Sequence, residues 1–296
     1  MMLSNIFGRE KSISKKQVIY EVNDNHDLVC KHPIEAYWWD EKKNFGDWIG
    51  PWLISEITGR PVINIKDQNS INAIFSVGSV IEHISKNHKD SIIWGSGLIK
   101  KIENKNHKKN VANIKNINAV RGKLTYQELT EKCGIYVPKI FGDPALLLPK
   151  FYNPRIDINT KKPSICPHYI HYNYFKNEDL SKNFKIVNVL ENPKKVIDEI
   201  VNSSLCISSS LHGIIIAQAY GVPWVWLQIV DKPLFGVDFK FHDFFSTCKS
   251  GNIPHVKLNA DNINYSNMLN ISKKANLNEL NICLDELLNA FPFNGD

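Results

Sequence analysis

The sequence lacks paired cysteines. The six that it has are Cys30, Cys133, Cys166, Cys206, Cys248 and Cys283. They are spread singly along the 296 residues, and none has the C-x-x-C spacing of a zinc knuckle or a redox pair. A chain of this length also needs no disulfide framework to hold its core. We therefore expect reduced thiols and no metal site.

Long apolar runs are absent as well. No run reaches the ~18 residues of a membrane-spanning helix, and residues 1–16 lack the apolar segment of a secretory signal. The net charge is only +6, and the basic residues are scattered rather than gathered in a stripe. The sequence thus predicts a cytoplasmic protein that binds no nucleic acid and associates at most peripherally with the inner face of the plasma membrane.

Short apolar runs alternate with amphipathic segments, a pattern typical of βαβ units and a parallel sheet. The fold class is therefore predicted to be α/β. In the first half, the predicted strands are 34–38, 73–77, 91–94, 117–120 and 139–141, and the predicted helices are 47–58, 79–85 and 123–133. In the second half, the predicted strands are 164–167, 185–190, 205–208 and 224–229, and the predicted helices are 193–202, 211–220 and 239–248.

Two prolines and a polar stretch, residues 152–162, separate the halves. We expect two Rossmann-like, doubly wound lobes, residues 1–152 and 153–296, with a ligand cleft between the carboxyl ends of their strands. The first lobe is expected to form the acceptor side of the cleft and the second the donor side. The second lobe ends in a predicted amphipathic helix over residues 277–291, which would pack on a lobe and could cross back to the first.

The turn after the strand at 205–208 concentrates groups that bind anions. Its residues are Ser208, Ser209, Ser210, Leu211, His212 and Gly213. Hydroxyls, an imidazole and the free N–H groups of a helix N-terminus together suit a phosphate or a carboxylate. The alternative is that the serines only cap the helix and that His212 is a core histidine with satisfied hydrogen bonds.

Two turns in the first half offer further polar side chains. Arg121 follows a strand directly, where its planar fork would suit a carboxylate or phosphate; the alternative is a surface arginine paired with a nearby acid. Asn44, Gly46 and Asp47 precede the first helix and suit a wall of the cleft. Alternatively, Asp47 is only an N-cap and Gly46 only a turn residue.

The remaining turns give weaker signals. Gly95, Ser96 and Gly97 follow a strand and indicate that backbone comes close to another group there. The turn at 142–145 is interpreted mainly as structural. His168 ends the first strand of the second half and has His171 nearby, but without a third ligand the pair does not predict a metal site.

Together these segments resemble the bacterial polysaccharide pyruvyl transferase family. The similarity runs in order through NFGDWIGPWL at 44–53, IWGSGLI at 93–99, AVRGKLT at 119–125, FGDPALLLP at 141–149, PHY at 167–169 and SSSLHGIIIAQAYGVPWVWLQ at 208–228. The resemblance implies a GT-B-like fold. It also implies transfer of the pyruvate group of phosphoenolpyruvate, without a further cofactor, to a sugar in capsule or exopolysaccharide biosynthesis, with a ketal as product.

The resemblance also implies roles for particular residues. It matches the family's arginine to Arg121 and its histidines to His212 and His168. From the residues themselves, we expect Arg121 and the Ser208–Gly213 turn to hold the donor, and Asn44, Gly46 and the Gly95–Gly97 segment to line the acceptor side or a wall of the cleft. The expected catalytic groups are His212, then His168, as general acid, and Asp47 as base or acceptor-orienting group. Relatives often carry arginine where this chain has Ser210, so either a lysine or the helix N-terminus does more to bind the donor here, or the donor is held differently.

Two rival functions stay open at this point. A glycosyltransferase that uses a nucleotide sugar would need the same fold and an anion-binding helix. A non-catalytic carbohydrate-binding subunit of a polysaccharide pathway would use aromatic side chains to stack on sugars. The sequence names neither the sugar acceptor, for which a lipid-linked oligosaccharide is one candidate, nor the hydroxyls that are bridged.

Overall fold

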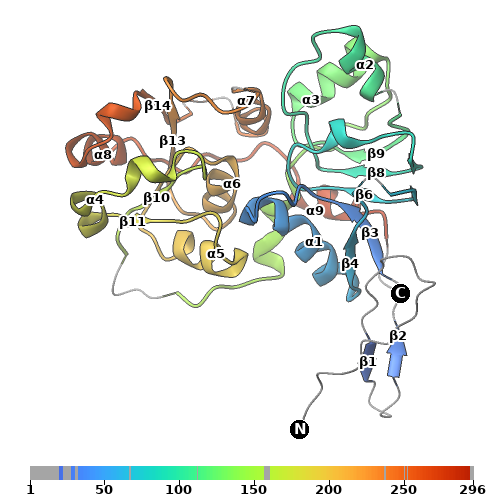
Figure 1. Cartoon of the computed structure of the whole chain (residues 1–296), viewed down its shortest axis with the longest axis horizontal. Helices are drawn as coiled ribbons and strands as arrows, with labels where there is room; N and C mark the ends of the chain where they lie inside the picture. The colour runs from blue at the N-terminus through green and yellow to red at the C-terminus, as the bar shows by residue number, and fades with distance from the viewer. Residues whose placement is uncertain are drawn as a thin grey trace.

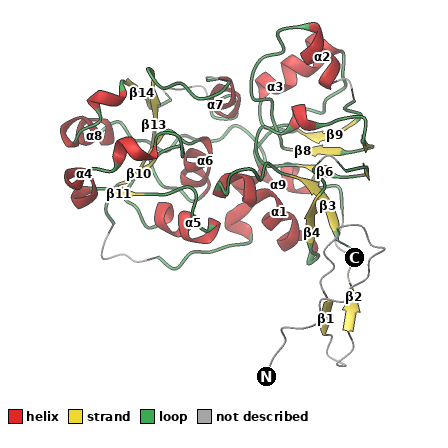
Figure 2. Ribbon diagram, viewed as in Figure 1, coloured by secondary structure: helices red, strands yellow, loops and turns green. Residues whose placement is uncertain are grey.

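The computed structural model describes residues 20–22, 28–30 and 33–293, apart from 67, 112, 157–160, 237, 250 and 252. Two five-stranded parallel sheets with flanking helices dominate these residues (Figure 1, Figure 2). The predicted α/β class is therefore confirmed. Among the described residues, no helix is both long and apolar enough to cross a bilayer.

The first sheet has the strand order β4-β3-β6-β8-β9. Its strands are β3 (Ile34–Tyr37), β4 (Val62–Asn64), β6 (Ile74–Phe75), β8 (Ile92–Trp94) and β9 (Asn116–Ala119). Four of them were predicted. The strand predicted at 139–141 is instead an isolated bridge between Val120 and Phe141, because the chain turns at once into the 3₁₀ helix η3 (Pro144–Lys150). Two small ladders lie outside this sheet: β1 (Tyr20–Val22) pairs with β2 (Leu28–Cys30), and β5 (Ser70–Ile71) with β7 (His88–Lys89).

The second sheet has the strand order β11-β10-β12-β13-β14. Its strands are β10 (Ser164–Cys166), β11 (Lys185–Ile186), β12 (Cys206–Ser208), β13 (Trp224–Ile229) and β14 (His255–Leu258). The strand predicted at 185–190 ends early, because the carbonyl of Val189 accepts a hydrogen bond from the N–H of Phe45 at 2.8 Å instead of continuing the sheet. The second half of the chain thereby contacts the start of the first long helix.

The helices cover both sheets. They are α1 (Phe45–Thr58), α2 (Lys105–Val111), α3 (Lys123–Gln127), α4 (Glu178–Asn183), α5 (Pro193–Val201), α6 (Leu211–Ala219), α7 (Phe239–Phe245), α8 (Tyr265–Ser272) and α9 (Leu284–Asn289). A π-helical segment, Glu128–Lys132, continues α3. The helix predicted at 79–85 is wrong: only the 3₁₀ turn Ile81–His83 forms, since Ile84 adopts an extended backbone that buries its side chain.

The two sheets share one apolar core. Buried side chains of the first sheet, such as Ile34 and Trp94, belong to the same cluster as Cys166 and Trp224 of the second. In Figure 1, α1 and α6 lie between the two sheets, and both contact η3. The N-termini of α1 and α6 are therefore brought together by packing between the two halves.

The end of the chain returns to the first sheet, as the sequence allowed, but as a shorter helix than predicted. Residues 276 and 280 form antiparallel bridges with Trp224 and Cys248, so helix forms only at α9. The Nε1 of Trp94 donates a 2.8 Å hydrogen bond to the carbonyl of Leu287. The Trp94 ring also meets Phe291 edge-on at 4.8 Å. Tertiary contacts thus outweigh the helical pattern over the first half of 277–291.

Replacing Leu287 by alanine should lower the free energy of unfolding by ~2–5 kcal/mol, because a fully buried leucine leaves a cavity in the core. Urea unfolding would measure this difference. The matched variant Glu286→Ala removes an exposed neighbour on the same helix and should change stability by less than ~0.5 kcal/mol. Equal stability of Leu287→Ala and wild type would contradict the docking of α9.

Candidate active site

The predicted site residues follow the carboxyl ends of strands in both sheets, and the packing between the halves brings several of them together. The clearest contact joins the starts of α1 and α6. A Cβ added to Gly46 would lie 2.2 Å from the Nδ1 of His212, so only glycine fits there. The ring of Phe45 meets the His212 ring edge-on at 6.4 Å. Gly46 is therefore a close-approach residue rather than a simple turn residue.

Asp47 lies in the first turn of α1 and is half-buried. Helix α1 begins at Phe45, so the N-cap is Asn44 and the alternative of Asp47 as N-cap is wrong. The Nδ2 of Asn44 donates a 2.8 Å hydrogen bond to the Asp47 carboxylate. Burial raises the pKa of Asp47, against the opposing effects of His212, Asn44 and Lys240. Asp47 is thus a stronger base than an exposed aspartate.

His212 faces an aspartate that the sequence did not single out. Its Nε2 lies 3.8 Å from the Oδ2 of Asp143, too far for a hydrogen bond. Both atoms are buried and have no hydrogen-bond partner in the described part of the chain. The reading of His212 as a core histidine with satisfied hydrogen bonds is therefore wrong. Unsatisfied buried polar atoms are rare and often mark a functional site. Asp143 also caps η3 through Oδ1, which explains why it was taken for a turn residue.

His168 lies beyond the end of β10 and is held by its backbone. Its N–H donates to the Oγ of Ser209 at 3.0 Å, and the same hydroxyl pairs with the Nδ1 of His171 at 2.9 Å. Burial first, and then the positive fields of Lys240, His171 and His212, lower the pKa of His168 to about 3. His168 is therefore a neutral imidazole and a weak base at physiological pH, which argues against the role of general acid expected from the sequence.

Most of the predicted anion-binding turn is used to build the turn itself. The Ser208 hydroxyl accepts from the Ser210 N–H at 3.0 Å and lies 2.8 Å from the carbonyl oxygens of Cys166 and Ser210. A Cβ on Gly213 would meet that hydroxyl at 2.4 Å, and the Leu211 side chain is buried in the core. Ser210 is the N-cap of α6, but its side chain makes no capping hydrogen bond. Among the three serines, Ser210 thus keeps its hydroxyl unengaged by the described residues.

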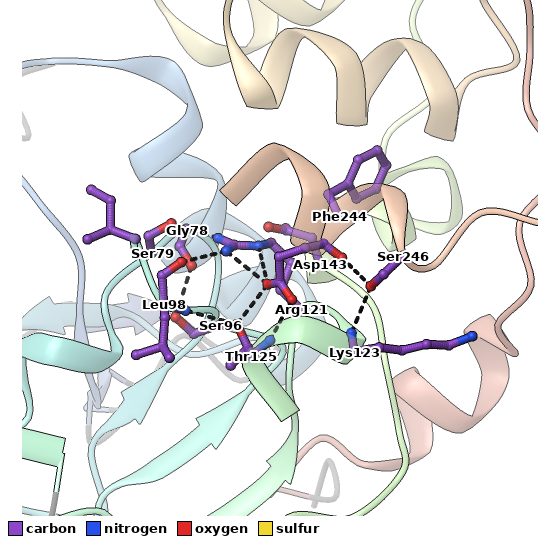
Figure 3. A network of polar contacts seen from close by, with 12 residues as sticks. Gly78, Ser79, Ser96, Leu98, Arg121, Lys123, Thr125, Asp143, Phe244 and Ser246 are labelled. Carbon is purple, nitrogen blue, oxygen red and sulfur yellow. Dashed lines mark hydrogen bonds and ion pairs between the residues drawn. The ribbon is translucent and has the colours of Figure 1, made fainter. Parts of the chain in front are cut away.

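Arg121 emerges at the end of β9, as predicted, but its side chain is fully buried (Figure 3). Its Nε donates to Asp243 at 3.0 Å, Nη1 to Ser79 at 2.6 Å, and Nη2 to the carbonyl of Leu98 at 2.7 Å. Nη2 also lies 2.9 Å from the Asp243 carboxylate. The arginine is therefore paired with an acid, as its alternative reading held, although the pair is buried rather than at the surface. Direct contact with a donor stays a prediction.

The Gly95–Gly97 segment supports this buried arginine. A Cβ on Gly97 would lie 2.4 Å from the Cζ of Arg121, so the guanidinium packs directly on the backbone. The carbonyl of Ser96 accepts a hydrogen bond from the backbone N–H of Arg121 at 2.9 Å. The hydroxyl of Ser96 donates to the carbonyl of Gly78. Gly95 has φ 77° and abuts Pro144. The predicted close approach of backbone is confirmed, while contact with an acceptor stays a prediction.

Helix α7 connects the two sheets and carries a residue that sequence reasoning missed. Phe241 stacks on Trp226 of β13 at 4.8 Å, whereas Asp243 binds Arg121 beyond β9. Lys240 lies on the same helix and is half-buried. Burial first, and then Arg121, lower the pKa of Lys240 to about 8, although Asp47 opposes the shift. No local pattern in KFHDFF marks this lysine, because its surroundings come from distant segments.

We call Asp47, Asp143, His168, His212 and Lys240 the junction cluster. A cavity of about 20 Å³ beside it, lined in part by His171, Ser209 and Asp238, is about the size of one water. A larger hollow of about 510 Å³ lies around Tyr126 and Lys139 and shares no lining residue with the cluster. Within the described residues, no three His, Cys, Asp or Glu side chains are grouped as a metal ion would require.

Two five-stranded parallel sheets with flanking helices define an α/β protein, with polar side chains gathered beyond the ends of its strands. Within that class, the chain belongs to the polysaccharide pyruvyl transferase family, whose model matches residues 19–229. The chain is also similar to the uncharacterised protein L143 of Acanthamoeba polyphaga mimivirus. The two are 25% identical over 223 residues, which cover 72% of this chain and 74% of that protein. Membership places the protein among transferases.

Replacing Asp243 by asparagine should lower the free energy of unfolding by ~3–5 kcal/mol, because it leaves the buried Arg121 charge without its counter-ion. Chemical denaturation would measure the loss. Asp285→Asn is the matched control: its partner Lys150 is exposed, so its removal should matter little. If Asp243→Asn were as stable as the control, the pair would not hold α7 in place.

Proposed function

We propose that the protein transfers the pyruvate group of phosphoenolpyruvate to a sugar of a surface polysaccharide or of its precursor, with a ketal and phosphate as products. The observation that carries this proposal is the junction cluster in a chain of this family. The cluster combines two carboxylates, two imidazoles and a cation, and two of its buried atoms, the Oδ2 of Asp143 and the Nε2 of His212, have no hydrogen-bond partner among the described residues. Such a set is suited to moving protons near an anionic substrate.

The donor brings a carboxylate and a phosphate, and both need positive charge or N–H donors. The N-terminus of α6 offers free backbone N–H groups and the Ser210 hydroxyl. Arg121 contributes its positive field and fixes α7, since its guanidinium is already engaged by protein groups. The donor lies in this scheme at the start of α6, on the side of the second sheet, and the acceptor on the side of the first.

The reaction needs one proton delivered and two removed. Protonation of the methylene carbon C3 creates positive charge at C2, which the first sugar hydroxyl attacks while losing its proton. The second hydroxyl then forms the other C2–O bond, phosphate leaves with the C2–O bond electrons, and the second proton is lost. His212 delivers the proton to C3, and Asp47 accepts the proton of the attacking hydroxyl, helped by its raised pKa. His168, a weak base because its pKa is lowered to about 3, holds the second hydroxyl as a hydrogen-bond partner, and the departing phosphate takes the second proton.

A GT-B-like arrangement of two facing lobes is consistent with a donor bound by one lobe and an acceptor bound by the other. The lobe around the first sheet would present Asn44 and Asp47 to the acceptor, and the lobe around the second sheet would present His168 and the start of α6 to the donor. A lipid-linked oligosaccharide at the inner face of the plasma membrane is one acceptor consistent with this proposal. No nucleic acid or metal ion takes part in it.

Calorimetric titration of phosphoenolpyruvate tests the proposal without knowledge of the acceptor. We expect saturable binding by the wild-type protein that UDP, GDP and their sugars do not displace, because the site is built for a small anion. Binding of a nucleotide or nucleotide sugar, with no heat from phosphoenolpyruvate, would instead indicate a glycosyltransferase. Binding of sugars alone would indicate a carbohydrate-binding subunit.

His212→Ala should reduce turnover by ~10²–10⁴-fold, the usual contribution of a general acid. The dissociation constant of phosphoenolpyruvate should change much less, because His212 acts on the bond-making step. Phosphate release with the acceptor that supports wild-type turnover would measure the loss. His242→Ala, on an exposed position of α7, should keep wild-type turnover. Full activity of His212→Ala would remove this residue from the mechanism.

A further inference from the structure

Lys240 is a cation that has no close counter-ion among the residues that the structure describes. Its side chain is half-buried on α7, and its Nζ lies 5.8 Å from the centre of the Phe241 ring. Across the residues that the structure describes, it makes no hydrogen bond and no ion pair within 4 Å. Lysines on protein surfaces point into water, and buried lysines are normally paired. Lys240 therefore carries a partly desolvated charge that the protein alone does not neutralise.

The position of Lys240 is fixed by its neighbour Asp243. The two residues are three apart on α7 and lie on one face of the helix. Asp243 binds Arg121 and also accepts from the N–H and hydroxyl of Thr125 at 2.8 and 2.7 Å. Because this network anchors α7 on the end of β9, the backbone of Lys240 is held near Arg121 and the other residues of the junction cluster.

The charges around Lys240 leave room for an anion. The groups that interact with it electrostatically are Arg121 from the first sheet, Asp47 from α1, and His168 and His171 beyond β10. Asp243, the acid on its own helix face, is already engaged by Arg121 and Thr125. Asp47 is thus the one carboxylate in this set that remains to balance Lys240. Because Asp47 makes no ion pair with Lys240 within 4 Å, a nearby anion would supply the close counter-ion that Lys240 lacks among the described residues.

The burial of Lys240 also destabilises the free protein. Its pKa in the folded protein is about 8, below its ordinary value of 10.5. A depressed lysine pKa means that folding disfavours the charged form, so the penalty is fully present below pH 8 and fades as the pH rises toward 10.5. A half-buried lysine that lowers the stability of the folded protein at physiological pH favours a role in binding rather than in folding.

We propose that Lys240 is a donor-binding residue whose ammonium contacts an anionic group of phosphoenolpyruvate. This assignment rests on the proposed function and adds to it the cation that the α6 turn lacks. The residue reaches the donor from α7, while the helix N-terminus and Ser210 reach it from α6. Arg121 and Asp243 then act as positioning residues, because they hold α7 and do not themselves need to touch the donor.

The test compares phosphoenolpyruvate binding by wild type, Lys240→Met, Lys240→Arg and the control Lys257→Met. Lys257 is an exposed residue of β14 in the same half of the chain. At pH 7.5, Lys240→Met should raise the dissociation constant at least ~10-fold, as expected for loss of a charged hydrogen bond. Lys240→Arg and Lys257→Met should stay near wild type. Thermal unfolding at pH 7 should show Lys240→Met to be no less stable than wild type.

The pH profile separates a binding role from a structural one. Above pH 8 the wild-type dissociation constant should rise toward ~10-fold per pH unit as the ammonium loses its proton. The donor phosphate stays a dianion there, since phosphate monoesters have a second pKa of about 6. Lys240→Arg should lose this rise, because arginine stays charged. Lys240→Met keeps Asp47, His168 and His171, so any contribution from these groups remains visible in that variant.

The outcomes are distinguishable. If wild type binds phosphoenolpyruvate and Lys240→Met binds it equally well with the same pH profile, the role of Lys240 is refuted while the proposed function stands. If wild type gives no binding at all, the proposed function fails, and the assignment of Lys240 fails with it. Weak binding by Lys240→Met, together with a flat profile for Lys240→Arg, establishes the contact.

Discussion

The buried ion pair between Arg121 and Asp243 is the interaction on which the site depends. It joins the end of β9 to α7 across 122 residues of sequence, and Gly97 and Gly122 leave no space there for larger residues. Such a pair adds little net stability, because both charges lose their hydration. Its effect is on geometry: it places α7, and with it Lys240, at the junction of the two sheets. The ion pair thus fixes the position of α7 relative to β9 more strictly than an apolar contact would.

Several charged or polar groups of the junction cluster lack close partners among the described residues. In the part of the chain that the structure describes, the Nε2 of His212 and the Oδ2 of Asp143 have no hydrogen-bond partner, and Lys240 has no counter-ion within 4 Å. Burial also raises the pKa of Asp47. His212 and Lys240 could be satisfied by an anionic ligand that accepts hydrogen bonds, whereas Asp143 and Asp47 would be satisfied by a hydrogen-bond donor such as a sugar hydroxyl. A family whose members transfer pyruvyl groups would need such a site. The same unpartnered groups therefore lower the stability of the free protein and make the cluster suited to bind a substrate.

The sequence predicted what is local. Buried strands such as β3 and β13, and helices such as α1 and α6, follow from apolar runs and their turns, and parallel topology then places the residues after those strands at sheet ends. The sequence did not predict the short polar strand β14 or the shortened length of α9. Both depend on pairing or packing with segments that are distant in the sequence. Likewise, Asp243 and Lys240 carry no local signature, and Asp143, although it lies in the segment 141–149, gives no sign in the sequence of its position opposite His212. Arg121 was located correctly, but its burial depends on a partner that only the folded chain supplies.

The most direct test of this account is a crystal structure of the protein with phosphoenolpyruvate bound. The account predicts the donor at the N-terminus of α6, with an anionic group within hydrogen-bond distance of the Lys240 Nζ and with the Arg121–Asp243 pair intact. A donor bound away from the junction cluster would contradict it. So would a donor held by Arg121 after the guanidinium had left Asp243, because the ion pair would then be a ligand-exchangeable contact and not the anchor of the site.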